Sequence, residues 1–386
     1  MMKINKNKKR IGVIGTGFIA KGFVLTLTNH RDFSVSKVLT RRTKRECREY
    51  PRKDVLTNSV NELMEDSDLI VECSGDAIHA ANVIDQALKM KKPVVTMNTE
   101  FHVTAGSYFV GKGLVTEAEG DQPGCLAALH EEVTQMGFEP LVYGNVKGFY
   151  NPNPTEEEMK FWAKKQGLSL PMVTASTDGT KVQYEQALVA NMFKAAIVKT
   201  GLVGPKTEDV KTSAFELVKY ARRLKQPISD YVINGRSPVR VFIVAKGDSR
   251  QRKALEYLKM GKGPVYYFDK NSILTYMEII KTVRRVLNGG GILLDNGQVP
   301  TVSIAAVAKH GICKGTKIEH PVGNFDMRGV AVEIKKVKDH VPMALLLNAV
   351  FKRKVNQGAI VCWDDVEIPE SLALKAWRSI AQRVLK

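Results

Sequence analysis

A glycine-rich turn near the start of the chain constrains the fold more than any other feature. Residues 10–15 (RIGVIG) form an apolar, strand-like run, and residues 15–20 (GTGFIA) follow it with the spacing GxGxxA. Gly15 permits a tight turn, Gly17 lets the backbone approach a pyrophosphate, and Ala20 keeps the next helix close to the strand. Strand, turn and helix in this order predict a dinucleotide site, although a structural turn in another α/β fold is the alternative.

The pattern after this turn continues as alternating strands and helices. Strand-like runs occupy residues 33–40, 68–75 and 92–98, with amphipathic helical segments between them; residues 125–133 (CLAALHEEV) fit a strand or a helix. Strands separated by helices of this length predict βαβ units and a parallel sheet. We therefore expect an α/β protein whose residues 1–150 form a doubly wound, NADP-binding Rossmann domain.

The sequence pattern changes at two further points, and these changes divide the rest of the chain. The prolines and charged helix of residues 151–167 break the first pattern, and NGGG at 288–291 precedes short strands with turns. Residues 151–290 are predicted to be a central α+β catalytic and dimerisation domain, and residues 291–386 a small β domain closed by a basic helix. Expected helices span 181–199, 209–223 and 249–260; expected strands are VRVFIVAKG, GPVYYF, TVSIAAVAK, GVAVEIKKV and AIVCWDDVEI.

Composition excludes several classes of protein. The five cysteines have no CxxC spacing, which is typical of reduced thiols and not of disulfides or a zinc site. No apolar run is long enough for a membrane span, and the basic N-terminal stretch leads into too few apolar residues for a secretory leader, so we expect a cytoplasmic protein. The net charge of +18 is spread along the chain without a nucleic-acid recognition signature. An anionic small molecule is the expected partner, with no nucleic acid and no membrane.

The end of the second strand indicates which dinucleotide binds. NAD sites usually place Asp or Glu there to hold the ribose 2′-hydroxyl. Here the strand ends in Thr40, Arg41 and Arg42, with no acid between Asp32 and Glu46. Two guanidinium groups and a hydroxyl can bind a 2′-phosphate. These residues predict NADP; two solvated surface arginines are the alternative.

Other residues of the same crevice follow from the topology, because ligands lie outside the carboxyl ends of parallel strands. The third and fourth strands end near Ser74 and Gly75 and near Asn98 and Glu100, respectively. The predicted cofactor-binding set is completed by the glycine turn and the two residues after it: Gly15, Gly17, Phe18 and Ile19.

Several stretches together resemble a known family. The strand GVIGTG, VVTMNTE at 94–100, GDQPG at 120–124 and DGTK at 178–181 resemble the homoserine-dehydrogenase-like oxidoreductases. The resemblance is greatest to the branch that includes the second, dehydrogenase-like type of 1-deoxy-D-xylulose 5-phosphate reductoisomerase. Residues 301–318 and 349–369, with their W-D-D-V close, resemble the SAF-type β domain that this branch carries.

The resemblance implies an NADP-binding domain, a central catalytic domain through which a homodimer forms, and a SAF appendage. It also implies oxidation or reduction of a small polar, often phosphorylated, sugar-like carbonyl compound, or a homoserine-dehydrogenase-like reaction on an amino acid. The apolar segment 187–203 is the expected buried element of the dimer. A non-catalytic carbohydrate-binding or assembly protein with a SAF domain is the alternative function.

The reacting centre is predicted at the DGTK segment. If a helix begins near Asp178, then Asp178, Lys181 and Glu185 share one face, and the carboxylates can orient the lysine. A lysine so placed is suited to general acid–base catalysis. Asp178 and Glu185 could instead hold Mg²⁺ or Mn²⁺, and Asp121, Gln122 and Thr180 are expected to contact substrate. A capped helix with a surface Lys–Glu pair is the alternative.

The seven histidines have no spacing that predicts a zinc site. His102 and His130 lie near the proposed crevice in sequence and are candidate proton carriers, although a surface or core position is the stronger interpretation of each.

Overall fold

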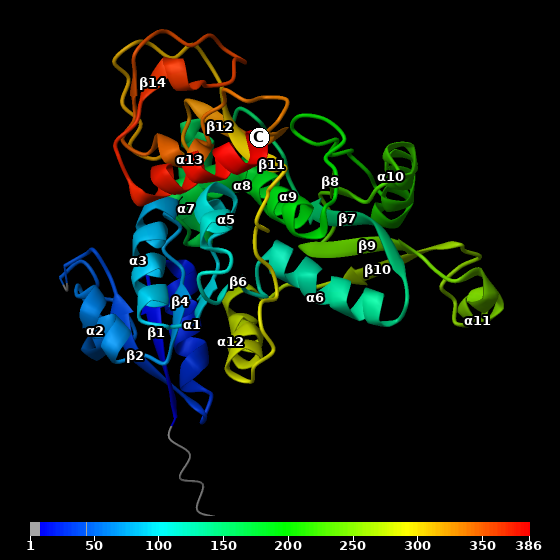
Figure 1. The fold of residues 1–386 in the computed structure, drawn as a ribbon, viewed down its shortest axis with the longest axis horizontal. Helices are drawn as coiled ribbons and strands as arrows, with labels where there is room; N and C mark the ends of the chain where they lie inside the picture. The colour runs from blue at the N-terminus through cyan, green and yellow to red at the C-terminus, as the bar shows by residue number, and fades with distance from the viewer. Residues whose placement is uncertain (1–7, 44) are drawn as a thin grey trace, which may run out of the picture.

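A six-stranded parallel sheet forms the first part of the computed structural model, which describes residues 8–43 and 45–386 (Figure 1). The strand order is β3-β2-β1-β4-β5-β6, and every neighbouring pair is parallel. This order is that of doubly wound dinucleotide-binding sheets. The elements are β1 (Lys9–Ile14), α1 (Phe18–Thr28), β2 (Phe33–Leu39), β3 (Leu56–Thr57), α2 (Val60–Glu65), β4 (Leu69–Glu72), α3 (Ala77–Lys89), β5 (Val94–Thr96) and β6 (Val115–Glu117).

Burial on both faces explains why these apolar runs form a parallel sheet. Ile11 and Val13 of β1 are fully buried, as are Leu69, Ile70 and Val71 of β4. Helices cover both faces, so strands without polar alternation are stable here. The predicted Rossmann fold is confirmed. The basic residues 1–7, on which the expectation about a leader partly rests, lie outside the described residues.

A second, mixed sheet follows, with strand order β10-β9-β7-β8. Its first strand, β7, pairs with both β8 and β9, so the expected boundary at 150 falls inside the elements that build this sheet. The ambiguous segment CLAALHEEV belongs to helix α6. The elements are α6 (Gln122–Gln135), β7 (Glu139–Lys147), α7 (Glu156–Gln166), α8 (Leu170–Thr177), α9 (Thr180–Phe193), α10 (Val210–Leu224), β8 (Ile228–Ile233), β9 (Arg240–Lys246), α11 (Arg252–Tyr257) and β10 (Val265–Lys270).

After this sheet the chain returns to the first one. Helix α12 (Ile279–Leu287) packs its apolar face into the core formed by β1, β2 and α1. The second expected boundary, at 290, therefore lies beyond a helix that packs on the Rossmann sheet. The structure changes from one sheet to the other near residue 120; division into three folding domains stays a prediction.

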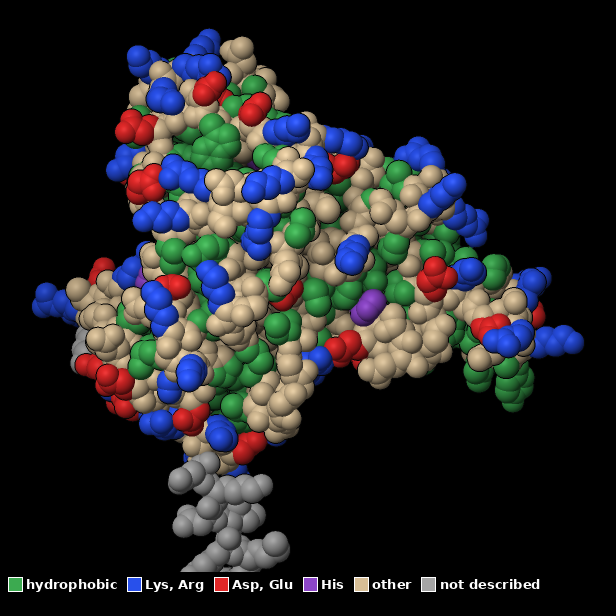
Figure 2. Space-filling view, in the orientation of Figure 1, with side chains coloured by type: hydrophobic (Ala, Val, Ile, Leu, Met, Phe, Trp, Pro, Cys, Tyr) green, Lys and Arg blue, Asp and Glu red, His purple; other side chains and the backbone are tan. Residues whose placement is uncertain are grey.

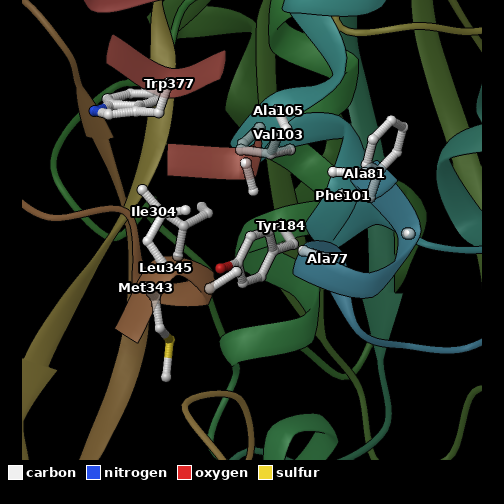
Figure 3. Packing of buried hydrophobic residues seen from close by; sticks show 14 of the residues in the cluster. Ala77, Ala81, Phe101, Val103, Ala105, Tyr184, Ile304, Met343, Leu345 and Trp377 are labelled. Carbon is white, nitrogen blue, oxygen red and sulfur yellow. The ribbon is translucent and has the colours of Figure 1, made fainter. Parts of the chain in front are cut away.

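The C-terminal part has two small antiparallel sheets and a C-terminal helix. The short strands and the basic helix expected from the sequence are therefore present. Strand β11 (Val302–Ala308) pairs with β12 (Met327–Glu333), and β13 (Val350–Phe351) pairs with β14 (Val366–Glu367). Helix α13 (Leu372–Leu385) packs against α3 of the first part. In Figure 3, Tyr184 of α9 lies between Ile304 and Leu345 on one side and Ala77 on the other, within a core shared by all three parts.

Helix α9 is enclosed by its own chain. It contacts α6, α8, β7 and β8 of the second part and β11 and β12 of the C-terminal part. The segment 187–203 was expected to be buried in a dimer, but its helical residues Ala187, Leu188 and Val189 are already fully buried in the monomer. That segment therefore gives no support to the predicted homodimer.

The surface carries both signs of charge. Figure 2 shows Lys and Arg side chains spread over the visible face and interspersed with Asp and Glu, most densely around the C-terminal part. Within the described residues, no helix combines the length and the apolar character that crossing a membrane requires.

A buried ion pair joins the second and C-terminal parts. Lys309 Nζ lies 2.7 Å from Asp178 Oδ2, and the lysine and aspartate side chains are 4% and 0% exposed. We expect Lys309→Met to lower the free energy of unfolding in urea by about 3 kcal/mol, because Asp178 would remain buried without its counter-charge. Lys336→Met, the control, removes a surface partner of Glu333 and should lower the free energy of unfolding by only about 0.5 kcal/mol. Equal losses in the two variants would contradict this prediction.

Candidate active site

One cavity of about 920 Å³ runs from the glycine turn to helix α9. All three parts of the chain line it, so it lies where the two sheets and the C-terminal part meet. The first sheet contributes the glycine turn and the ends of β2 and β4; the second part contributes α6, α8 and α9. The lining residues include Gly15, Thr16, Gly17, Phe18, Ile19, Thr40, Arg41, Arg42, Ser74, Gly75, Glu100, Asp121, Gln122, Lys147, Met172, Lys181, Glu185, Thr275, Tyr276 and Val322.

The glycine turn has the geometry of a phosphate cradle. Gly15 has φ +110°, and a Cβ there would lie 2.8 Å from the carbonyl oxygen of Cys73. Gly17 begins α1 with φ −76°, and a Cβ at this position would meet no atom within 4 Å. The backbone at Gly17 thus borders open space at a helix N-terminus, where a pyrophosphate fits. The turn fits the nicotinamide dinucleotide that the sequence predicts.

The end of β2 forms the rim of a smaller adjoining cavity of about 340 Å³. Arg42 lines both cavities, and its backbone N–H donates to Thr40 Oγ1 at 3.1 Å. Arg41 Nη1 pairs with Asp76 Oδ2 at 2.9 Å while its side chain stays 65% exposed. Burial, and then the charge of Arg41, lower the pKa of His79, which keeps this imidazole neutral. Arg41 and Arg42 therefore give this end of the cavity a positive rim.

Lys181 is the basic group at the other end of the cavity. Its Nζ lies 3.3 Å from Glu100 Oε1, 3.8 Å from Asp121 Oδ2 and 3.3 Å from Thr99 Oγ1. It projects from the first turn of α9, while Glu100 follows β5 and Asp121 caps α6. The structure thus brings together a lysine and two carboxylates from three separate elements.

The charges around Lys181 set its protonation state. Burial lowers the pKa of Lys181, but the carboxylates of Glu100, Asp121 and Glu185 outweigh it and hold the pKa above its ordinary value. Burial raises the pKa of Glu185 against the opposing charge of Lys147. Glu185 also accepts a hydrogen bond of 2.6 Å from Asn145 Nδ2. Lys181 is therefore an ammonium group near neutral pH, and it can donate a proton into the cavity.

Three of the predicted site residues do not line the cavity. Asp178 ends α8 and pairs with Lys309, because α9 begins at Thr180 and not at 178. Thr180 is buried and accepts the backbone N–H of Gly329 at 2.8 Å. Asn98 is buried and accepts the N–H of Phe101, which caps a helical turn. The expectation that Asp178 orients Lys181 is wrong, since its carboxylate faces the C-terminal part.

Asp178 and Glu185 were also the candidate ligands of a Mg²⁺ or Mn²⁺ ion, and of the two only Glu185 lines the cavity; a bound metal ion stays a prediction. Over residues 8–43 and 45–386, no group of three or more His, Cys, Asp or Glu side chains has an arrangement suited to a metal ion.

Neither candidate histidine lines the cavity. His102 lies in a π-helical turn (His102–Gly106), where burial lowers its pKa to about 3, and its Nε2 is 3.5 Å from Glu117 Oε2. Burial also raises the pKa of Glu117 well above its ordinary value, so burial opposes charge on both groups of this pair. His130 Nδ1 lies 2.8 Å from the hydroxyl of Tyr143, and its ring stacks on Phe193. His102 is therefore a buried core residue, and His130 is half-buried on the side of α6.

Several lining residues have no signal in the sequence pattern. Lys147 ends β7, a strand that the pattern did not indicate. Met172, Tyr276 and Val322 reach the cavity from α8, from the segment before α12 and from the C-terminal part. Had β7 been recognised in the sequence, the rule that ligands bind near the carboxyl ends of strands would have indicated Lys147.

Comparisons with known proteins agree with this geometry. The family described as "Homoserine dehydrogenase, NAD binding domain" matches residues 15–108, and "Oxidoreductase DRL, catalytic domain" matches residues 120–279. The second match begins where the structure passes from the first sheet to the second. Both matched families are oxidoreductase families. The chain thus has a segment similar to the NAD-binding domain of homoserine dehydrogenases, followed by a segment similar to an oxidoreductase catalytic domain.

Individual relatives are more distant. Homoserine dehydrogenase of Bacillus subtilis (strain 168) is 27% identical over 144 residues, which are 34% of this chain. The matched stretch spans only 31% of that enzyme. Among solved structures, a homoserine dehydrogenase from Thiobacillus denitrificans gives a TM-score of 0.48 at 14% identity, covering 91% of this chain and 98% of that one. A UDP-N-acetylglucosamine 3-dehydrogenase from Acidithiobacillus ferrooxidans gives 0.44 at 11% identity, covering 75% and 92%.

The open space at Gly17 gives a direct test of the cradle. Gly17→Val should weaken dinucleotide binding at least 10-fold, because the backbone there tolerates a side chain but the side chain would fill the pyrophosphate position. The dissociation constant is measured by nicotinamide fluorescence. Gly148→Ala is the control, since a Cβ there also meets open space but away from the cavity. Unchanged binding by the valine variant would exclude the cradle.

Proposed function

We propose that the protein is an NADP-dependent oxidoreductase that interconverts a hydroxyl and a carbonyl group on a small polar substrate, with Lys181 as the general acid–base. One observation supports this most strongly. The ammonium group of Lys181 stands between Glu100 and Asp121 in the same cavity that the dinucleotide cradle lines.

The choice of NADP rests on the end of β2. Arg41 and Arg42 line the proposed adenosine end, and their guanidinium groups can bind a 2′-phosphate with charge-assisted hydrogen bonds, although Arg41 already pairs with Asp76 through Nη1. The nearest carboxylate, Asp76, holds Arg41 through one oxygen and caps α3 through the other. Both carboxylate oxygens of Asp76 are thus bound within the protein, so Arg41 and Arg42 leave the cavity rim with a net positive charge.

The proposed chemistry divides between the cofactor and the chain. The nicotinamide, when bound, supplies or accepts a hydride. During reduction Lys181 donates its proton to the substrate oxygen and is then reprotonated from solvent. Oxidation is the reverse: Lys181 first releases its proton to solvent, and the neutral amine then accepts the proton of the substrate hydroxyl. Glu100 and Asp121 keep Lys181 in place and protonated between turnovers. Glu185 can accept hydrogen bonds from the substrate, and Gln122 can both accept them from the substrate and donate them to it.

The substrate end favours a compound with hydroxyl or amino groups. Its walls carry Glu100, Asp121 and Glu185 against Lys147 and Lys181, so hydrogen-bond acceptors are abundant. We propose a sugar-like compound, phosphorylated as in the reductoisomerase branch, with the phosphate toward Lys147. Homoserine is the second candidate, because its amino group suits the carboxylates and the NAD-binding domain matches the homoserine dehydrogenase family. The SAF-like nature of residues 291–386 and a homodimer stay proposals.

The assignment of NADP predicts that reversing the charge of the two arginines weakens the binding of NADPH but not that of NADH. Replacing both Arg41 and Arg42 with Asp should raise the KM for NADPH at least 10-fold while changing the KM for NADH less than 3-fold, because only the 2′-phosphate meets these side chains. Steady-state kinetics with both reduced cofactors measure this. A parallel rise in the two KM values would rule out the 2′-phosphate site.

The acid–base assignment predicts a loss confined to turnover. Lys181→Met should lower kcat about 10² to 10⁴-fold and leave NADPH affinity nearly unchanged. Lys160→Met, on an exposed face of α7, is the control. The assay follows NADP-linked reduction and oxidation of sugar phosphates, polyols and L-homoserine, with and without Mg²⁺ or Mn²⁺. A Lys181→Met enzyme that keeps more than about a third of wild-type kcat would remove Lys181 from the mechanism.

A further inference from the structure

The segment between β10 and α12, residues 271–278, passes from the second sheet to the Rossmann part beside the glycine turn. Thr275 and Tyr276 of this segment line the cavity together with Gly17 and Phe18. Neither residue lies in a strand end or in a motif, and nothing in the proposed chemistry uses them.

Tyr276 is fitted against the dinucleotide-binding helix. Its ring lies over Gly22 of α1 so closely that a Cβ at Gly22 would stand 2.6 Å from three ring atoms. Its ring also meets Phe18 edge to face, with centroids 5.6 Å apart. A glycine inside a helix costs about 1 kcal/mol relative to alanine. At Gly22 it leaves room for the ring, which therefore has one defined position.

The preceding residue is held just as closely. A Cβ at Gly120 would overlap the carbonyl oxygen of Thr275, and Thr275 itself has φ +48°, which is unusual for a β-branched residue. Glu278 secures the end of the segment: it accepts the N–H of Leu274 at 2.7 Å and pairs with Lys270 and Lys281. Such strained backbone persists only where its surroundings hold it, and it is concentrated at functional sites.

The position of the segment indicates which half of a dinucleotide it would meet. Gly120 directly precedes Asp121, the partner of Lys181, so Thr275 is adjacent to the reacting end of the cavity. Arg41 and Arg42 mark the adenosine end, and neither Tyr276 nor Thr275 lines the smaller cavity there. Tyr276 therefore lines the larger cavity outside the part that Arg41 and Arg42 share with the smaller one.

We propose that Tyr276 is a further cofactor-binding residue, whose ring contacts the nicotinamide half of the bound dinucleotide opposite the glycine turn. This rests on the proposed function, which requires a nicotinamide dinucleotide in this cavity. The site is then completed by a residue about 260 positions after the turn, carried by the segment that joins the two sheets.

The test separates the two halves of the ligand. NADPH binding is measured by fluorescence and 2′,5′-ADP binding by calorimetry, for the wild type, Tyr276→Ala, Tyr276→Phe and Leu274→Ala. Leu274 is 57% exposed in the same segment and does not line the cavity, so its variant reports loosening of the segment alone. Thermal unfolding confirms that each variant is folded.

Tyr276→Ala should raise the dissociation constant of NADPH about 10-fold and leave that of 2′,5′-ADP within 2-fold, because the latter lacks the nicotinamide half. Tyr276→Phe and Leu274→Ala should stay within 2-fold for both ligands. A Tyr276→Ala value within 2-fold for NADPH, equal losses for the two ligands, or an equal loss in Leu274→Ala overturns the inference.

Failure of the proposed function gives a different result. A wild type that binds neither NADPH nor NADH excludes the dinucleotide site itself, and Tyr276 with it. A wild type that prefers NADH overturns only the NADP assignment, and the comparison then uses NADH against ADP with the same expected ratios.

Discussion

Helix α9 is the element on which the rest of the structure depends, because its buried polar side chains satisfy backbone groups of the surrounding parts. Gln186 Nε2 donates to the carbonyl of Tyr143 in β7. Gln183 Oε1 accepts the N–H of Ala331 in β12, and Asn191 Oδ1 accepts that of Val302 in β11. A buried backbone group left without a partner costs about 1–3 kcal/mol, so each bond specifies how these parts meet. Lys181 and Glu185 project from the same helix, and their positions therefore follow from the packing of the whole chain.

The cavity has a gradient of charge from one end to the other. Arg41 and Arg42 make the adenosine end positive, whereas Glu100, Asp121 and Glu185 surround Lys181 at the other end. An isolated lysine in this position would tend to lose its proton on burial, and the carboxylates reverse that tendency. In the proposed reaction the same carboxylates would also accept hydrogen bonds from substrate hydroxyl or amino groups. One set of charges would then serve both the protonation of the lysine and the recognition of the substrate.

Local features of the sequence predicted the first part of the structure well. The GxGxxA turn, the apolar strands and the helix spacing depend on interactions within about 30 residues, and the parallel sheet follows from them. The placement of Lys181 in the cavity was also predicted, through the DGTK segment. Its carboxylate partners were predicted as Asp178 and Glu185, on helical spacing that assumed a start at 178. The helix begins two residues later, so Asp178 lies outside it and pairs with Lys309, 131 positions away in sequence. Of the closest carboxylates, Glu100 was expected as a cofactor contact, and Asp121 as a substrate contact that could complete the set around Lys181.

The remaining part of the site could not be predicted because it depends on contacts between distant segments. The C-terminal part looks like an appendage in sequence, yet its residue Val322 lines the cavity. The neighbouring Gly323 packs so closely on α8 that a Cβ there would overlap the carbonyl of Pro171. Lys309 directly follows β11. Its ammonium group pairs with Asp178 at the end of α8 and also donates a hydrogen bond of 2.7 Å to the carbonyl oxygen of Asn324. The loop that carries Val322 and the helix that carries Met172 are therefore anchored to the same buried charge. Movement of the C-terminal part would therefore displace Val322 at the cavity wall and Asp178 at the end of α8 together, so this part contributes directly to the candidate site.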